Sequence, residues 1–121
     1  MQLHLSFRDM ESSPAVDAKV RERAARLERY FDRITACRVV IESPHQHHHQ
    51  GRRFRVRIDL TVPDGEIVAD TGRSSSSAHE DVYVAIRDAF DTARRNLEDW
   101  ARRRRGEVKL HAPTRRSEAA Y

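Results

Sequence analysis

Hydrophobic residues recur along the chain with two different spacings. They occupy every second position over residues 2–7, 35–42, 53–62 and 66–70, a pattern that predicts strands with one buried face. Over residues 14–31 and 78–105 they recur every three or four positions, as one buried stripe of an α-helix requires. The predicted order of elements is therefore β-α-β-β-β-α.

The ends of both predicted helices carry matching signals. Ser12 or Ser13 is placed to cap the first helix, and Pro14 falls in its first turn, where the missing N–H costs nothing. The longer helix has acidic residues in its first turn and four arginines at 102–105 in its last, a distribution that suits the helix dipole.

The element order also predicts how the layers pack. The first helix connects two strands, which should therefore be parallel, whereas the last three strands should form an antiparallel meander. Each strand has one apolar face, so both helices should cover the same side of the sheet. We expect an α+β fold, a four-stranded mixed sheet with two roughly parallel helices on one face.

Charged side chains are sorted about the apolar stripes of the two helices. At 100° per residue, basic residues gather on one flank of each stripe and acidic residues on the other. If the basic flanks face each other, the helices form an arginine-lined groove suited to a phosphate backbone. The alternatives are that both flanks face outward, or that this is an ordinary salt-bridged surface. We expect the groove, with RNA-binding residues Lys19, Arg23, Arg26, Arg33, Tyr83, Arg87, Arg94, Arg102 and Arg105.

The length of the chain predicts a single domain, and its charge predicts a basic one. The chain has 121 residues, enough for a single core, and 23 Lys and Arg against 19 Asp and Glu. An acidic stretch at 61–86 separates two basic blocks, so the net charge understates how basic one face is. No periodicity follows residue 105, so we expect a domain over 1–105 and a mobile C-terminal tail over 106–121.

Several classes of function find no support in the sequence. Cys37 is the only cysteine, which excludes an internal disulfide. No apolar run approaches the ~20 residues of a membrane span, and no signal peptide is recognisable, so we expect a cytoplasmic protein. Without a nucleophile elbow, a Gly-rich phosphate loop or a paired-carboxylate site, we expect no enzyme, no cofactor and no small-molecule substrate.

Two polar features allow more than one interpretation. The histidines at 45, 47, 48 and 49 offer zinc or nickel ligands, but neighbouring residues of one loop rarely converge on an ion. We therefore expect no metal site and a flexible loop that touches RNA, with metal-dependent regulation as a weaker alternative. Arg53, Arg55 and Arg57 point outward from the third strand, where a solvated face balanced by Glu42 and Asp59 is favoured over RNA contact.

Three segments carry a resemblance to a known family. They are ARLERYFDRI at residues 25–34, RIDLTVPDGE at 57–66 and HEDVYVAI at 79–86. These look like the end of the first helix, the strand–turn–strand and the start of the second helix in the ribosome hibernation promoting factors, which include ribosome-associated inhibitor A. The resemblance spans about residues 1–105.

The resemblance implies a fold related to double-stranded RNA-binding domains. It also implies docking on the small ribosomal subunit and its rRNA, in the channel that tRNA and mRNA use. The implied activity is occlusion of that channel, which inhibits translation under stress or in stationary phase. Because sixteen residues follow Arg105, the chain resembles the short members of the family, and we expect a monomer away from the ribosome.

The chain departs from the family pattern in its second helix. Thr92, Glu98 and Asp99 stand where the family is often basic, which weakens the expectation of rRNA contacts at these positions. An alternative function follows from this departure: a protein-interaction regulatory module on the same fold that does not bind ribosomes.

Overall fold

A four-stranded sheet with two helices on one face makes up the molecule, and the computed structural model describes residues 1–43, 53–73 and 77–111. The elements are β1 (Gln2–Arg8), α1 (Pro14–Tyr30), β2 (Ala36–Glu42), β3 (Arg55–Val62), β4 (Gly65–Asp70), short 3-10 helices η1 (Thr71–Arg73) and η2 (Ser77–Glu80), and α2 (Val82–His111). The predicted order of strands and long helices is confirmed.

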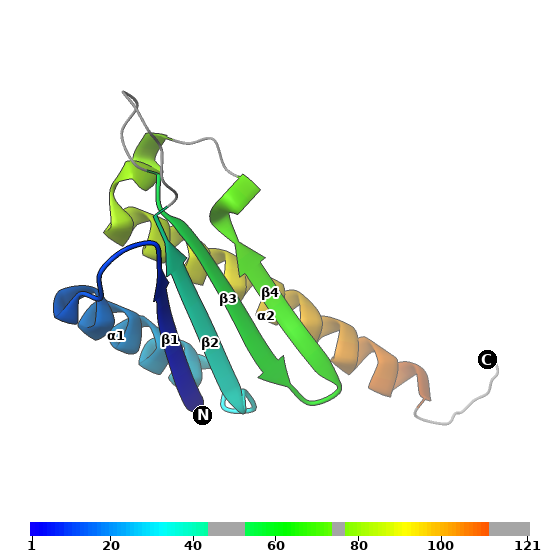
Figure 1. Ribbon diagram of the computed structural model, residues 1–121. Helices are drawn as coiled ribbons and strands as arrows, with labels where there is room; N and C mark the ends of the chain where they lie inside the picture. The colour runs from blue at the N-terminus through cyan, green and yellow to red at the C-terminus, as the bar shows by residue number, and fades with distance from the viewer. Residues whose placement is uncertain (44–52, 74–76, 112–121) are drawn as a thin grey trace.

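The sheet has the order β1-β2-β3-β4 (Figure 1). β1 pairs in parallel with β2, with Leu5 opposite Val39, and the two remaining pairs are antiparallel. The predicted parallel crossover and antiparallel meander are therefore confirmed.

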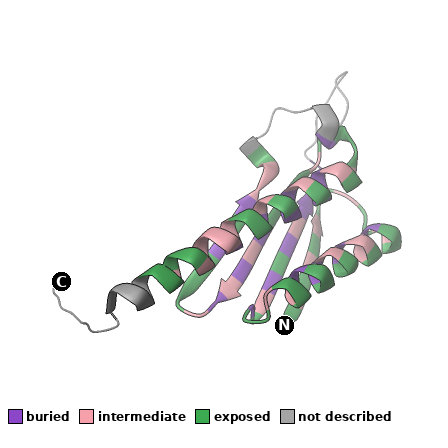
Figure 2. Cartoon of the chain, turned by 180° about the vertical axis from the view of Figure 1, so that it is seen from behind, coloured by how far each residue is buried: buried purple, intermediate pink, exposed green. Residues whose placement is uncertain are grey.

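Both helices cover the same face of the sheet and run side by side in the same direction (Figure 2). α1 packs beside β1, and α2 lies across β3 and β4. The core between the layers includes fully buried Val39 and Ile58 from the sheet and Val20, Ile86 and Leu97 from the helices. Burial of these side chains, at about 1.5–3 kcal/mol each, holds the two helices against one another and against the sheet.

The start of α1 follows its sequence signal. Ser13 is the N-cap, its side-chain oxygen accepts a hydrogen bond from the Val16 backbone N–H at 3.2 Å, and Pro14 opens the helix. The helix ends one residue before Phe31, whose extended backbone turns the chain toward β2.

Helix α2 differs from its predicted bounds at both ends. It begins at Val82 instead of residue 78, because Asp81 provides the cap: its carboxylate accepts from the Tyr83 backbone N–H at 2.9 Å. It continues through Gly106 to His111, beyond the predicted end at residue 105. Gly106 does not adopt the positive φ of a helix-terminating glycine, and the residues after it are mostly helix formers.

Two predictions fall outside the described residues. The histidine-rich loop lies within residues 44–52, and the predicted tail lies mostly within residues 112–121. The expectations of a flexible RNA-touching loop and a mobile tail therefore stay predictions.

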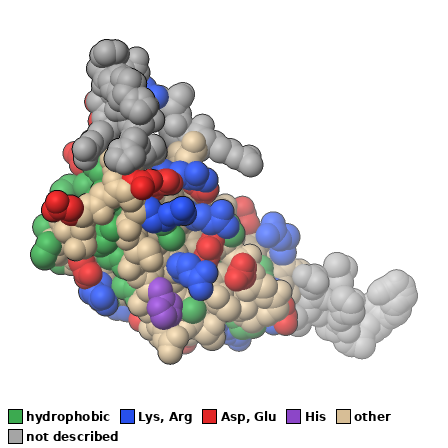
Figure 3. Space-filling model, viewed as in Figure 1, with side chains coloured by type: hydrophobic (Ala, Val, Ile, Leu, Met, Phe, Trp, Pro, Cys, Tyr) green, Lys and Arg blue, Asp and Glu red, His purple; other side chains and the backbone are tan. Residues whose placement is uncertain are grey.

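The uncovered face of the sheet carries arginines and carboxylates in alternation (Figure 3). Arg55 forms a two-pronged contact with Asp70, at 3.1 Å through Nε and 2.8 Å through Nη2. Arg57 reaches Asp59 at 3.1 Å. Glu42, which the sequence analysis named as a balancing carboxylate, lies directly across from Arg55 on β2 and helps to raise the pKa of its guanidinium, while Asp70 on β4 adds the hydrogen-bonded partner that the sequence did not indicate. These pairings agree with the favoured interpretation of a solvated, internally balanced face.

Candidate nucleic-acid interface

A groove runs between α1 and α2 on the helical side of the molecule. It consists of two hollows, of about 210 and 370 Å³, that both border Tyr30 at the end of α1. We call them the first and the second hollow, and together the interhelical groove. The basic flanks of the two helices therefore face each other, as the sequence predicted.

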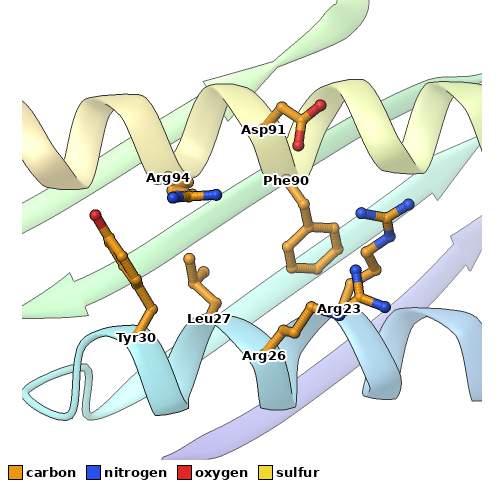
Figure 4. A pocket seen from close by; sticks show the side chains of 7 residues that line it. All are labelled: Arg23, Arg26, Leu27, Tyr30, Phe90, Asp91 and Arg94. Atoms are coloured by element: carbon orange, nitrogen blue, oxygen red, sulfur yellow. The ribbon is translucent and has the colours of Figure 1, made fainter.

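The first hollow combines an apolar floor with a cationic rim. Leu27 and Phe90 are almost fully buried and form the floor. The whole lining is Arg23, Arg26, Leu27, Tyr30, Phe90, Asp91 and Arg94 (Figure 4). Three guanidinium groups and one carboxylate give this hollow an excess of positive charge.

Helical spacing explains why these side chains meet. Arg23, Leu27 and Tyr30 follow one another at four and three residues along α1, which places them on one side of the helix. Phe90 and Arg94 are four residues apart on α2 and face the same space. Because the helices run in parallel, the two rows stay opposite each other along the groove.

Tyr30 stands at the boundary between the hollows and is 51% exposed. The guanidinium of Arg94 lies 4.6 Å from the centre of its ring, a cation–π contact. The phenol donates a hydrogen bond to Oε2 of Glu98, and Nε of Arg94 lies 3.6 Å from the same oxygen. One carboxylate thus holds both partners of the stack in place.

The second hollow continues the groove toward the C-terminal half of α2. Its floor is apolar, its only carboxylate is that of Glu98, and its two cations are Arg102 and Arg105. The lining is Tyr30, Phe31, Leu97, Glu98, Ala101, Arg102 and Arg105. Leu97 is fully buried, so the floor is part of the hydrophobic core.

The ion pairs beside the groove are exposed and exchangeable. Glu22 accepts from Lys19 and from Arg26, both at 3.0 Å, and the hydrogen bond from Lys19 is the main cause that lowers the pKa of the Glu22 carboxyl. Arg23 forms no ion pair with any side chain that the structure describes. Exposed pairs contribute little to stability, about 0–1 kcal/mol, so these guanidinium groups are free to turn toward a phosphate.

Five of the nine residues predicted from sequence come together in the groove. They are Arg23, Arg26, Arg94, Arg102 and Arg105.

The other four predicted residues lie outside the two hollows. Lys19 is bound to Glu22, and Arg33 follows the end of α1, so the helical wheel no longer applies to it. Arg87 donates two hydrogen bonds to Oδ1 of the neighbouring Asp88, at 3.1 and 3.2 Å. Tyr83 lies near the start of α2 and is 42% exposed. RNA contact by these four residues stays a prediction.

Three of the groove residues that carry a polar group were not predicted as RNA-binding residues from the sequence. They are Tyr30, Asp91 and Glu98, whereas the predicted set consisted of basic residues and Tyr83. A signal existed for Tyr30, which lies three residues after Leu27 at the edge of the apolar stripe. No sequence signal pairs Tyr30 with Arg94, because their contact depends on how α1 and α2 pack.

Among the described residues, no three His, Cys, Asp or Glu side chains are grouped as a metal site would need. None of the described helices is long and apolar enough to cross a membrane.

Comparison with known proteins places the chain in a family. Residues 3–105 match the family described as sigma 54 modulation protein / S30EA ribosomal protein. The chain belongs to the S30EA ribosomal protein family. The resemblance noted from sequence is thereby confirmed, and because the family consists of hibernation factors and not of enzymes, so is the prediction of a non-enzyme.

Curated relatives of this S30EA family chain are named as ribosome hibernation factors. A ribosome hibernation promotion factor of Deinococcus radiodurans is 36% identical over 104 residues, covering 85% of this chain and 51% of the relative. A ribosome hibernation promoting factor of Pseudomonas putida is 31% identical, covering 80% of this chain and 83% of the relative. The chain thus spans about half the length of the Deinococcus protein and most of the Pseudomonas one.

Two solved structures share the fold. A ribosomal subunit interface protein from Coxiella burnetii superposes with a TM-score of 0.65 at 15% identity, over 84% of this chain and 98% of the other. The N-terminal domain of Thermus thermophilus Protein Y gives a TM-score of 0.63 at 22% identity, over 83% and 99%. The predicted α+β fold is confirmed by this likeness as well as by the structure itself.

Proposed function

We propose that this protein is a ribosome hibernation factor that binds the small ribosomal subunit through its rRNA. Bound there, it inhibits translation under stress or in stationary phase by occupying the channel that tRNA and mRNA use. The names of its relatives support the ribosomal part of this proposal. The interhelical groove supports the contact with RNA.

The convergence of five arginines from two helices on one groove is the observation that carries the proposal. Arginine presents a planar fork of donors that matches a phosphate group, and its charge does not titrate at physiological pH. Two facing rows of arginine along parallel helices form an elongated cationic surface, which suits the extended backbone of a nucleic acid better than it suits a compact ligand. Binding requires no catalytic group, because the bound protein acts by exclusion.

Cosedimentation with purified small subunits over a salt series tests the proposal. If five or six phosphates are contacted, log Kd should change with log salt with a slope of about 4, since each contact releases a condensed counterion. Absence of association even at low salt would overturn the proposal.

A charge-reversed groove gives the sharper version of this experiment. Arg26→Glu combined with Arg94→Glu should abolish cosedimentation at moderate salt and leave the fold intact, because both side chains are exposed. The matched control is Arg21→Glu with Arg103→Glu, which changes net charge by the same amount at exposed positions that line neither hollow. Equal loss in both variants would mean that overall charge, and not the groove, determines binding.

A second candidate function rests on the carboxylates inside the groove. Asp91 and Glu98 soften its positive potential, which also suits a protein partner that carries charges of both signs. Capture of a partner from nuclease-treated lysate, with no association with ribosomes, would favour this protein-interaction module.

A further inference from the structure

The second hollow is lined by three kinds of group that can recognise a nucleotide: an aromatic ring, a carboxylate and cations. Tyr30 supplies an aromatic wall, and Glu98 supplies the only carboxylate in the lining. Arg102 and Arg105 supply two cations. A groove that bound only phosphates would need neither the aromatic wall nor the acid.

One face of the Tyr30 ring is available on the side of this hollow. Arg94 lies over the ring and lines the first hollow (Figure 4). The second hollow is bordered by Tyr30 but not by Arg94. The guanidinium therefore covers one face, and the other face borders the second hollow. A base stacked there would complete a sandwich of base, phenol and guanidinium, and stacking on an aromatic side chain is worth about 1–3 kcal/mol per base.

Glu98 is placed to read the edge of that base. Its contacts with Tyr30 and Arg94 both go to Oε2, and among the described residues Oε1 accepts no hydrogen bond. A carboxylate only accepts hydrogen bonds, so it prefers a base edge with adjacent donors. Guanine presents two, N1–H and the 2-amino group, whereas uracil presents one donor between two acceptors.

Arg102 and Arg105 complete the set at the far side of the hollow. They are three residues apart on α2, so both lie on one side of the helix. Arg102 is bound to Asp99 in an exposed pair that a phosphate can replace at little cost. The apolar floor of Phe31, Leu97 and Ala101 favours a flat, weakly hydrated ligand over a water-filled cleft.

We propose that the second hollow binds one unstacked guanine of an RNA strand, with the base on Tyr30, its donor edge on Glu98 and its phosphate between Arg102 and Arg105. This inference rests on the proposed function, since it names the base that the groove would select from rRNA. It also explains why Glu98, a carboxylate that would repel a phosphate, lines the hollow.

Binding of short RNAs of equal length and charge tests the inference. The probes are labelled oligouridines with guanosine, inosine, adenosine or uridine at the central position, measured by fluorescence anisotropy at one low salt concentration. The protein should bind the guanosine probe about tenfold more tightly than the uridine probe, the discrimination expected of a two-donor contact. Inosine lacks the 2-amino group and should lose most of that preference.

Four variants, two of them controls, separate the roles of the carboxylate and the aromatic ring. Glu98→Gln should reduce the guanosine preference to about twofold or less, while Glu66→Gln, a carboxylate on the other face of the sheet, should keep it. Tyr30→Leu should weaken binding of all four probes about tenfold, and Tyr30→Phe, which keeps the ring, should not. Circular dichroism confirms that each variant is folded.

The outcomes distinguish this inference from the proposed function. Equal binding of the four probes, no binding of any, or a guanosine preference that survives Glu98→Gln would overturn the guanine site. Cosedimentation with small subunits decides the proposed function separately, so a ribosome-binding protein without base preference would lose only the inference made here.

Discussion

Nε2 of His79 lies 2.8 Å from Oδ2 of Asp88, and the imidazole is the donor because a carboxylate only accepts. His79 is 5% exposed and belongs to η2, so this contact ties the segment before α2 to the second turn of the helix. The His79 backbone carbonyl also accepts a hydrogen bond from the Phe54 N–H at 2.8 Å, which extends the tie toward β3.

Removal of the Asp88 carboxylate should therefore destabilise the protein. Asp88→Ala leaves a buried imidazole N–H without its partner, which we expect to lower the free energy of unfolding by about 1 kcal/mol, a value reduced for the partial exposure of Asp88. Urea denaturation at neutral pH measures the change. Arg87→Ala is the control, since it removes only an exposed contact to the same carboxylate and should cost less.

The same pair predicts how stability depends on pH. The hydrogen bond from His79 is the main cause that lowers the pKa of the Asp88 carboxyl below its ordinary value. A lowered folded-state pKa means that the stabilisation is present above the unfolded-state pKa and is lost as pH falls through the folded-state value. The difference between wild type and Asp88→Ala should be constant above about pH 5 and shrink below pH 4. A difference that stays the same down to pH 2 would contradict this linkage.

The contacts of Arg94 lead to a prediction about salt dependence. Arg94 stacks on Tyr30 at 4.6 Å and lies in the first hollow, where the proposed function has it meet a phosphate. Arg94→Ala should weaken small-subunit binding about tenfold and reduce the log–log salt slope by about 1, because one counterion fewer is released. Arg95→Ala is the matched control on the same helix, since Arg95 is exposed and lines neither hollow. A slope that does not change in Arg94→Ala would mean that this guanidinium meets no phosphate.

The elements and the topology could be predicted because they depend on local patterns. Alternation in β3 and the three-to-four spacing in α2 each reflect burial against one layer, and a single sequence records that burial directly. The topology left two arrangements of the basic flanks open, facing each other or facing outward, and only the packing of α1 beside α2 decides between them.

The features that were missed depend on register and packing between distant segments. Arg55 forms its hydrogen bonds with Asp70 of β4, which lies directly across from Arg57, and the pattern of one strand does not reveal such a diagonal contact. Tyr30 meets Arg94 and Glu98 only because α1 ends where α2 passes. Such contacts join residues far apart in sequence, so no local periodicity signals them.

Cys37 should be chemically inert in the folded protein. Its side chain is fully buried in β2, and burial, with a contribution from the charge of Asp59, raises the pKa of the thiol to about 12. Because only the thiolate reacts, a disulfide reagent at pH 8 should label Cys37 at the rate of unfolding and instantly in denaturant. Fast labelling of the native protein would show that β2 opens locally.

The edge-to-face contact of Phe31 with Trp100 should stabilise the packing of the end of α1 against α2. The two rings are 5.6 Å apart at 89°, and Arg104 lies 5.1 Å over the indole. Trp100→Ala removes a half-buried ring that joins the end of α1 to α2, so we expect it to lower the free energy of unfolding by about 2–3 kcal/mol. Arg104→Ala should cost less than about 1 kcal/mol, because the cation–π contact and the pairing with Asp64 are at the surface.

Urea denaturation followed by far-UV circular dichroism compares the two variants, since Trp100 is the only tryptophan and fluorescence would be lost with it. If Trp100→Ala proved no more destabilising than Arg104→Ala, the aromatic pair would contribute nothing to holding α2 beside α1.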